Sequence, residues 1–263
     1  MHSLLVAHDL SPEADLALMR GAALARLHGL RLDVVHVLDE DAGDDQAQQA
    51  HDALEGQLDT LGLGEVQPWI RRGRVVEAIL TQATGLQAGL LVLGRHHRHS
   101  PSGFAGTTLE RILLACPMPV LLVVDTPQPY TRALAALDFS RCASRALHSA
   151  WQLMAPSGEL TALNIHEVAE VLGADPADLA LQQELFDQLL ADLRQELPAN
   201  GARLVSCLRQ GERSLRLDAA IAEFRPQLLA LGGHSRGEIS DALLGSLTRA
   251  YLDQPPCDVL IAR

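Results

Sequence analysis

Short apolar runs alternate with longer segments of helical periodicity along the first half of the chain. Five runs are short enough to be strands, at residues 3–8, 31–37, 66–71, 89–93 and 119–124. Four segments between them repeat their apolar positions every three to four residues, at 12–28, 45–61, 74–87 and 106–115. The pattern predicts five strands that alternate with four helices.

The second half repeats this order. Its predicted strands are 133–137, 159–165, 202–208, 227–231 and 257–262. Its predicted helices are 141–154, 176–197, 214–224 and 245–253. Strands that are apolar throughout and alternate with helices are typical of parallel sheets covered on both faces. We therefore expect an α/β protein with two tandem, doubly wound parallel sheets of five strands each. Such sheets bind ligands at the carboxyl ends of their strands.

Matching segments indicate that the two halves are copies of one unit. Each half begins with an apolar run that ends in Asp-x-Ser, at 4–11 and at 133–140. A later run ends in glycine in both halves, at 90–94 and at 228–232. The preserved order indicates a tandem duplication. Residues 125–131 contain two prolines and form the predicted linker. The predicted domains are residues 1–126 and 131–263.

Composition narrows the possible functions. The chain has 263 residues, a formal net charge of −12, 48% hydrophobic residues and only 3% aromatic residues, so its core must be aliphatic. All 21 basic residues are arginine, and the absence of lysine excludes a P-loop lysine, a kinase lysine and a side-chain Schiff base. The excess of acids argues against nucleic-acid binding, which needs a basic surface.

The cysteines and the lengths of the apolar runs indicate where in the cell the protein is found. The four cysteines lie far apart and form no CxxC pair, which favours free thiols in a reducing cytosol. The N-terminal residues have no basic segment and too short an apolar run for a secretion signal, and no apolar run approaches 18 residues. We expect a cytoplasmic protein with no membrane partner.

The motifs taken together resemble the universal stress protein family. The resemblance rests on Asp-x-Ser after the first strand, a glycine loop after a late strand, a following Gly-Ser or Gly-Thr, and a closing apolar strand. Its most specific parts are residues 106–111 and 116–123. It covers nearly the whole chain, so the sequence is similar to a tandem protein with two UspA-like domains.

The resemblance carries several implications. It implies flavodoxin-like sheets of the adenine-nucleotide-hydrolase-like superfamily and a role in the stress response. It also implies that the last strands of the two halves pair inside one chain as a pseudo-dimer, with further homodimerisation left open. Some family members bind ATP and others do not, so an adenine nucleotide is the expected cofactor.

The family's nucleotide motif fits the second half better than the first. In the second half Gly232 begins the loop, His234 and Ser235 follow, and nine residues separate Ser235 from Gly245-Ser246. Ser235 stands where the family has a second glycine, and glycine there lets backbone N–H groups approach phosphate.

The first half departs further from the motif. Its loop begins at Gly94, His97 replaces the second glycine, and only eight residues precede Gly106-Thr107. A histidine ring in a shortened loop would fill the space that phosphate needs. The spacing therefore predicts tighter nucleotide binding in the second half than in the first.

Two acids complete the candidate sites, and each has a simpler alternative. Asp9 and Asp138 occupy the position that lies beside ribose and adenine in ATP-binding relatives. Asp-x-Ser also caps a following helix through Ser11 or Ser140 with nothing bound.

Histidines gather at the predicted ligand side of the first half. His8, His36, His96 and His97 lie at or beyond strand ends. Converging imidazoles could bind a metal, but no HxH or HExxH pattern supports this, and we expect a structural or solvated cluster. No catalytic set is recognisable. Three functions stay open: a nucleotide-binding stress module, a nucleotide-free scaffold and a slow ATP hydrolase.

Overall fold

A computed structural model describes residues 1–95, 107–167, 176–199, 201–233 and 244–263. The chain divides into two compact units, Met1–Pro129 and Tyr130–Arg263. Each unit folds around its own parallel sheet.

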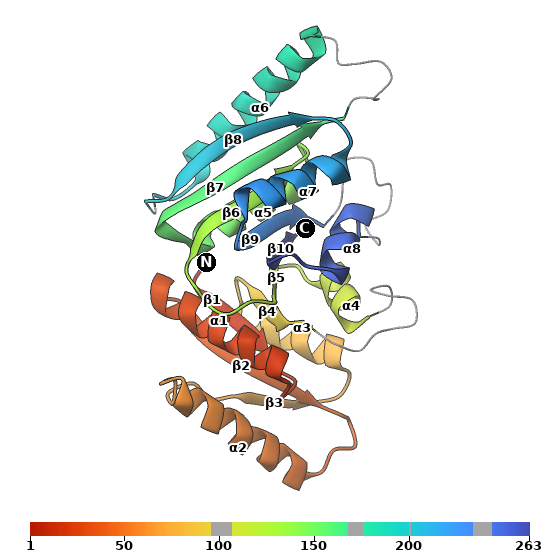
Figure 1. The fold of residues 1–263 in the computed structure, drawn as a ribbon. Helices are drawn as coiled ribbons and strands as arrows, with labels where there is room; N and C mark the ends of the chain where they lie inside the picture. The colour runs from red at the N-terminus through yellow and green to blue at the C-terminus, as the bar shows by residue number, and fades with distance from the viewer. Residues whose placement is uncertain (96–106, 168–175, 200, 234–243) are drawn as a thin grey trace. The chain divides into compact units, whose positions relative to one another are not determined.

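The first unit follows the predicted alternation (Figure 1). Its elements are β1 (Ser3–Ala7), α1 (Pro12–His28), β2 (Arg31–Leu38), α2 (Asp44–Thr60), β3 (Trp69–Arg72), α3 (Val75–Gly85), β4 (Leu91–Gly94), α4 (Thr108–Ala115) and β5 (Val120–Val123). The strand order is β3-β2-β1-β4-β5, and every neighbouring pair is parallel.

The order of the strands creates a switch point in the first unit. The chain moves outward from β1 to β3 and then returns to place β4 on the other side of β1. Because parallel crossovers are right-handed, this reversal puts α1 and α2 on one face of the sheet and α3 and α4 on the other. A hydrogen bond from Gln57 to Asp15 joins α2 to α1, and α3 packs against α4. A crevice opens at such a switch point, at the carboxyl ends of β1 and β4.

The second unit repeats the plan. Its elements are β6 (Tyr130–Leu137), α5 (Arg141–Leu153), β7 (Met154–His166), α6 (Pro176–Glu196), β8 (Arg203–Gln210), α7 (Arg213–Phe224), β9 (Leu228–Gly232), α8 (Ser246–Asp253) and β10 (Asp258–Ala262). The order β8-β7-β6-β9-β10 is again parallel throughout, with its switch point between β6 and β9. The prediction of doubly wound parallel α/β sheets is confirmed.

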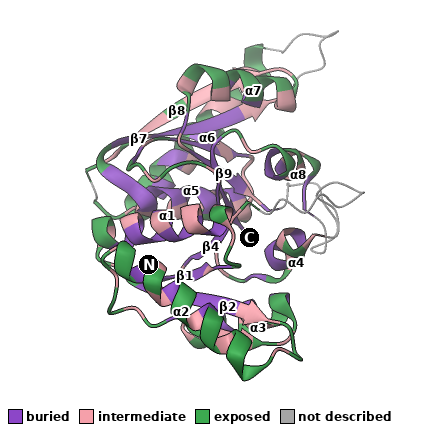
Figure 2. Cartoon of the chain, turned by 60° about the horizontal axis from the view of Figure 1, so that its bottom comes forward, coloured by how far each residue is buried: buried purple, intermediate pink, exposed green. Residues whose placement is uncertain are grey.

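Aliphatic side chains form the core of each unit, as the low aromatic content requires. The central strands are mostly buried, and the helices expose their outer faces (Figure 2). Within α2 only Ala50, Leu54 and Leu58 are buried, which matches a polar helix with one apolar stripe.

Two strands of the second unit begin earlier than predicted. β6 starts at Tyr130 rather than at 133, and β7 starts at Met154 rather than at 159. The two additions pair with each other, Tyr130 against Met154, ahead of a register shift. Gly158 permits this irregularity, since a Cβ there would lie 3.0 Å from the carbonyl oxygens of Tyr130 and Ala155. Residues 130 and 131 therefore belong to a strand, and the linker is shorter than predicted.

Candidate functional site

A cavity of about 360 Å³ occupies the switch point of the first unit. Its walls come from the ends of β1, β2 and β4, from the first turns of α1 and α4, and from α3. Most of the lining is aliphatic, and the polar exceptions are His8, Asp9, Ser11, Arg95 and Thr108. A concave, mainly apolar site with a few polar groups is the usual form of a small-molecule site.

The Asp-x-Ser motif forms a tight turn at the edge of this cavity. Asp9 Oδ1 accepts a hydrogen bond from the Ser11 N–H at 3.1 Å and another from the Ser11 hydroxyl. Ser11 Oγ in turn accepts from the Ala14 N–H at 3.2 Å and caps α1. Leu10, between them, has a φ of +63°, a left-handed conformation that costs a residue with a side chain roughly 1–2 kcal/mol. The motif therefore has a structural task in addition to any ligand contact.

The second unit builds the same turn. Asp138 Oδ1 accepts from the Ser140 N–H at 3.0 Å, Ser140 Oγ accepts from the Ala143 N–H at 3.1 Å, and Phe139 has a φ of +63°. Neither central residue is glycine, so a turn that both units keep despite its cost is a specific feature of the fold.

The glycines that end β4 and β9 are required by packing. A Cβ on Gly94 would lie 2.6 Å from the carbonyl carbon of Glu13 and 2.8 Å from the Ala14 nitrogen. A Cβ on Gly232 would lie 2.9 Å from the Ala143 nitrogen. In each unit the strand end passes directly beneath the first turn of the neighbouring helix, so the first glycine of each predicted phosphate loop serves backbone packing.

The two units differ in how the helix that follows the glycine loop begins. Thr107 caps α4, because its side chain accepts from the Glu110 N–H at 3.1 Å. Gly245 caps α8 without a side-chain bond, and Ser246 is the exposed first residue of that helix. Of the other predicted site residues, His97, Gly106, His234 and Ser235 lie outside the described residues, as does His96.

Two of the predicted histidines meet beneath the first unit's turn. His8 Nδ1 accepts from the Leu10 N–H at 3.0 Å, so Nε2 carries the hydrogen and donates to Asp15 Oδ1 at 3.0 Å. His36 Nδ1 donates to the carbonyl oxygen of His8 at 2.7 Å. Both nitrogens of His8 are thus in hydrogen bonds, and this ring is a structural group rather than a metal ligand.

Burial sets the charge state of His8. The side chain has no exposed surface, and burial lowers its pKa below the ordinary value of 6.5, against the opposing influence of Asp15 and Asp9. Gln57 of α2 also donates to Asp15 Oδ1, at 2.8 Å. Sequence patterns missed Asp15 and Gln57, because their partners lie on separate elements.

The corresponding cavity of the second unit is smaller. It measures about 100 Å³, lies between the ends of β6 and β9, and is lined by Asp138, Gly232, Gly245 and Ser246 among others. Arg213 also lines it and pairs with Glu167 at 2.6 Å. The described candidate residues of the second unit thus line one cavity, and in the first unit Asp9 and Gly94 line the other, while Thr107 caps α4 next to the lining residue Thr108.

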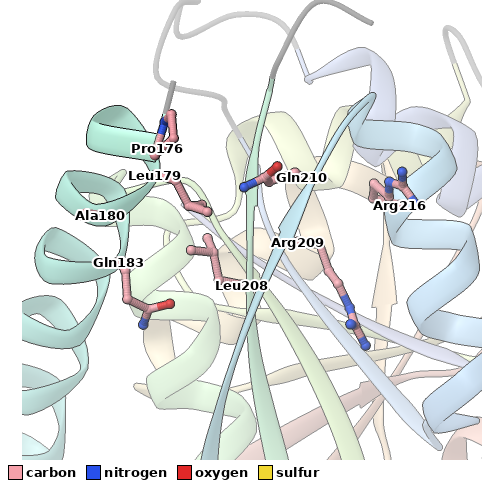
Figure 3. A pocket seen from close by; sticks show the side chains of 8 residues that line it. All are labelled: Pro176, Leu179, Ala180, Gln183, Leu208, Arg209, Gln210 and Arg216. Carbon is pink, nitrogen blue, oxygen red and sulfur yellow. The ribbon is translucent and has the colours of Figure 1, made fainter. Parts of the chain in front are cut away.

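A larger hollow of about 640 Å³ lies elsewhere in the second unit, around the end of β8. Figure 3 shows Leu179 of α6 and Leu208 of β8 on one side of the strand and Arg209 and Arg216 on the other. Arg209 pairs with Glu223 at 2.9 Å. The hollow therefore bends around a sheet edge and is more open to solvent than the cavity of the first unit.

A group of metal-ligand residues lies on the surface of α2. His51 Nδ1 lies 3.5 Å from Glu55 Oε2 and 3.9 Å from Asp52 Oδ1, and all three side chains are partly or largely exposed. Neighbouring charges on one exposed helix form such groups without an ion.

No helix among the described residues is long and apolar enough to cross a membrane.

Comparison with known proteins agrees with the geometry. The Universal stress protein family matches residues 1–124 and again residues 129–263. A universal stress protein of Mycobacterium tuberculosis is 25% identical over 299 residues, covering 100% of this chain and 97% of that protein. One from Thermus aquaticus is 29% identical over 133 residues, which is 46% of this chain and 97% of that protein.

Solved structures show the same fold. A universal stress protein from Archaeoglobus fulgidus has a TM-score of 0.71 at 16% identity, covering 99% of this chain and 98% of its own. A universal stress protein from Pseudomonas aeruginosa has a TM-score of 0.66 at 17% identity, covering 100% and 93%. With the family matched in both halves, the chain belongs to the universal stress protein family and carries two of its domains in tandem.

Proposed function

We propose that this tandem universal stress protein is a stress-response module that binds an adenine nucleotide such as ATP. The observation that carries the proposal is the cavity of about 360 Å³ at the switch point of the first unit. Its volume falls in the range of small-molecule sites, roughly 300–1,000 Å³. Its position is where open α/β sheets bind their ligands.

The lining of this cavity suits each part of a nucleotide. Val35, Val37 and Ile79 supply an aliphatic surface for a purine ring. The Asp9 carboxylate is an acceptor for ribose hydroxyl groups. Arg95 is the cation for the phosphates, and the first turn of α4 adds backbone N–H groups that favour anions.

Two arguments point to different units. The nine-residue spacing before Gly245-Ser246 favours the second unit, whereas cavity volume favours the first. The second unit's cavity of about 100 Å³ lies below the range of roughly 300–1,000 Å³ that small-molecule sites usually have, whereas the first unit's cavity of about 360 Å³ lies within it. We therefore assign the nucleotide to the first unit.

A nucleotide-free scaffold is the second candidate function. It is favoured by the structural tasks of the motif residues, since Gly94 and Gly232 serve packing and Ser11, Ser140 and Thr107 cap helices. These tasks would preserve the motif with nothing bound.

Titration with ATP by calorimetry separates these candidates. Ala7 and Ala136 hold equivalent positions, two residues before each acid, and each lines its own unit's cavity. Ala7→Phe and Ala136→Phe therefore fill the two cavities as a matched pair, with circular dichroism to confirm folding. We expect ATP binding by the wild type, its loss in Ala7→Phe and its retention in Ala136→Phe. Loss only in Ala136→Phe would move the site to the second unit, and no binding by the wild type would favour the scaffold.

Slow ATP hydrolysis and a cytoplasmic location stay predictions of the sequence. Release of labelled phosphate from ATP tests the first, and fractionation of the source cells tests the second.

A further inference from the structure

The turn beside the first unit's cavity depends on a neutral histidine. The Leu10 N–H, in its left-handed conformation, has His8 Nδ1 as its acceptor at 3.0 Å. A protonated imidazole has a hydrogen on both nitrogens and accepts no hydrogen bond. Protonation of His8 would therefore turn this bond into a contact between two N–H groups.

The groups that face His8 decide which of its bonds survives protonation. Asp15 of α1 accepts from Nε2, and this bond gains a full ion pair when the ring is charged. Asp9, the next residue along the chain, also favours the charged ring, while His36 of β2 opposes it. Gln57 of α2 reaches the ring only through Asp15. The bond to Asp15 is kept, and the bond that holds the turn is lost.

The second unit has no histidine among the residues of its turn. Leu137 takes the position of His8 and is buried. Asn164 of β7 donates to the Leu137 carbonyl oxygen at 2.7 Å, as His36 does to the His8 carbonyl oxygen. The Asn164 amide is fixed in turn by Gln182 of α6, at 2.7 Å. The chain thus contains the same turn once with a histidine directly before its aspartate and once with a leucine there.

We propose that His8 is a pH-responsive positioning residue, which holds the Asp9–Leu10–Ser11 turn while neutral and releases it when protonated. Asp9 and Ser11 line the cavity, so acid weakens ligand binding in the first unit and leaves the second unit's turn unchanged. The statement about the turn stands by itself, and the statement about the ligand rests on the proposed function.

Nuclear magnetic resonance of the ¹⁵N-labelled full chain tests the turn. We expect the Leu10 amide resonance to shift between pH 8 and pH 5 with a one-proton midpoint below 6.5, and the Phe139 amide to stay constant. A Leu10 amide that does not titrate over this range overturns the proposal, and so does a Phe139 amide that titrates in parallel.

Two substitutions separate this role from simple packing. His8→Asn has no titrating ring, but its side-chain oxygen can still accept from the Leu10 N–H. Asp9 makes the same kind of bond to the N–H of Ser11, two residues further along the chain. His8→Leu offers the Leu10 N–H no acceptor. Both variants should lose the titration of the Leu10 amide, but only His8→Asn should keep the turn at pH 8, whereas His8→Leu should loosen it at every pH. If that titration persists in His8→Asn, another group causes it, and the proposal is wrong.

The ligand statement is tested by ATP titration of wild type and His8→Asn at several pH values. Below the midpoint the wild-type Kd should rise by up to about tenfold per pH unit more than that of His8→Asn. Protonation of the nucleotide phosphate affects both proteins equally and cancels in the comparison. Equal pH profiles overturn this statement. Absence of binding at every pH, with a titrating Leu10 amide, would refute the proposed function and leave the turn mechanism intact.

Discussion

Glycine ends β4 and β9, where each strand passes beneath the first turn of a helix. At Gly94 the atoms that a Cβ would meet are backbone atoms of Glu13 and Ala14, which cannot move without displacing α1. At Gly232 the approach is slightly less close, 2.9 Å to the Ala143 nitrogen. At the residue scale, therefore, these glycines are explained without a phosphate.

Gly94→Ala tests this explanation. Overpacking against fixed backbone costs about 1–3 kcal/mol, and we expect the upper end for Gly94→Ala and the lower end for Gly232→Ala in urea unfolding. Gly56→Ala is the matched control, because a Cβ in that part of α2 meets nothing within 4 Å. The free energy of unfolding of this control should rise by about 0.5–1 kcal/mol. Equal stability of Gly94→Ala and wild type would mean that the packing argument fails.

At the element scale, the sequence predicts strands and helices well wherever an apolar pattern is continuous. The predicted helix at 12–28 coincides with α1, since Ser11 and Pro12 mark its start and Gly29 its end. The pattern failed at the start of β7, where Pro156 and Gly158 are typical of a loop and the pairing of Tyr130 with Met154 is non-local.

The sequence predicted part of the candidate site, as it predicted part of the secondary structure. Helix capping by Ser11 and Ser140 follows from local spacing. The left-handed conformation of Leu10 and Phe139 could not be predicted from the sequence, because bulky residues rarely adopt it. The bond between His8 and Asp15 depends on the packing of α1 against the end of β1, and the bond between Gln57 and Asp15 depends on the packing of α2 against α1. Hydrophobic periodicity reports neither contact.

At the scale of the whole molecule, the pairing of the two halves through their last strands stays a prediction from the family. A chain of 263 residues folded as one compact body should have a radius of gyration of about 18 Å. Small-angle X-ray scattering on a monomer, verified by light scattering, measures this value. Two separate bodies on a linker would give a clearly larger radius and a profile that changes with salt.

The central claim is that one adenine nucleotide binds per chain, in the cavity of the first unit. Native mass spectrometry with saturating ATP tests it most directly, because the mass reports how many nucleotides are held. We predict a mass increase equal to one nucleotide for the wild type and for Ala136→Phe, and no increase for Ala7→Phe. An unchanged wild-type mass, two nucleotides per chain, or a bound nucleotide in folded Ala7→Phe would contradict the account.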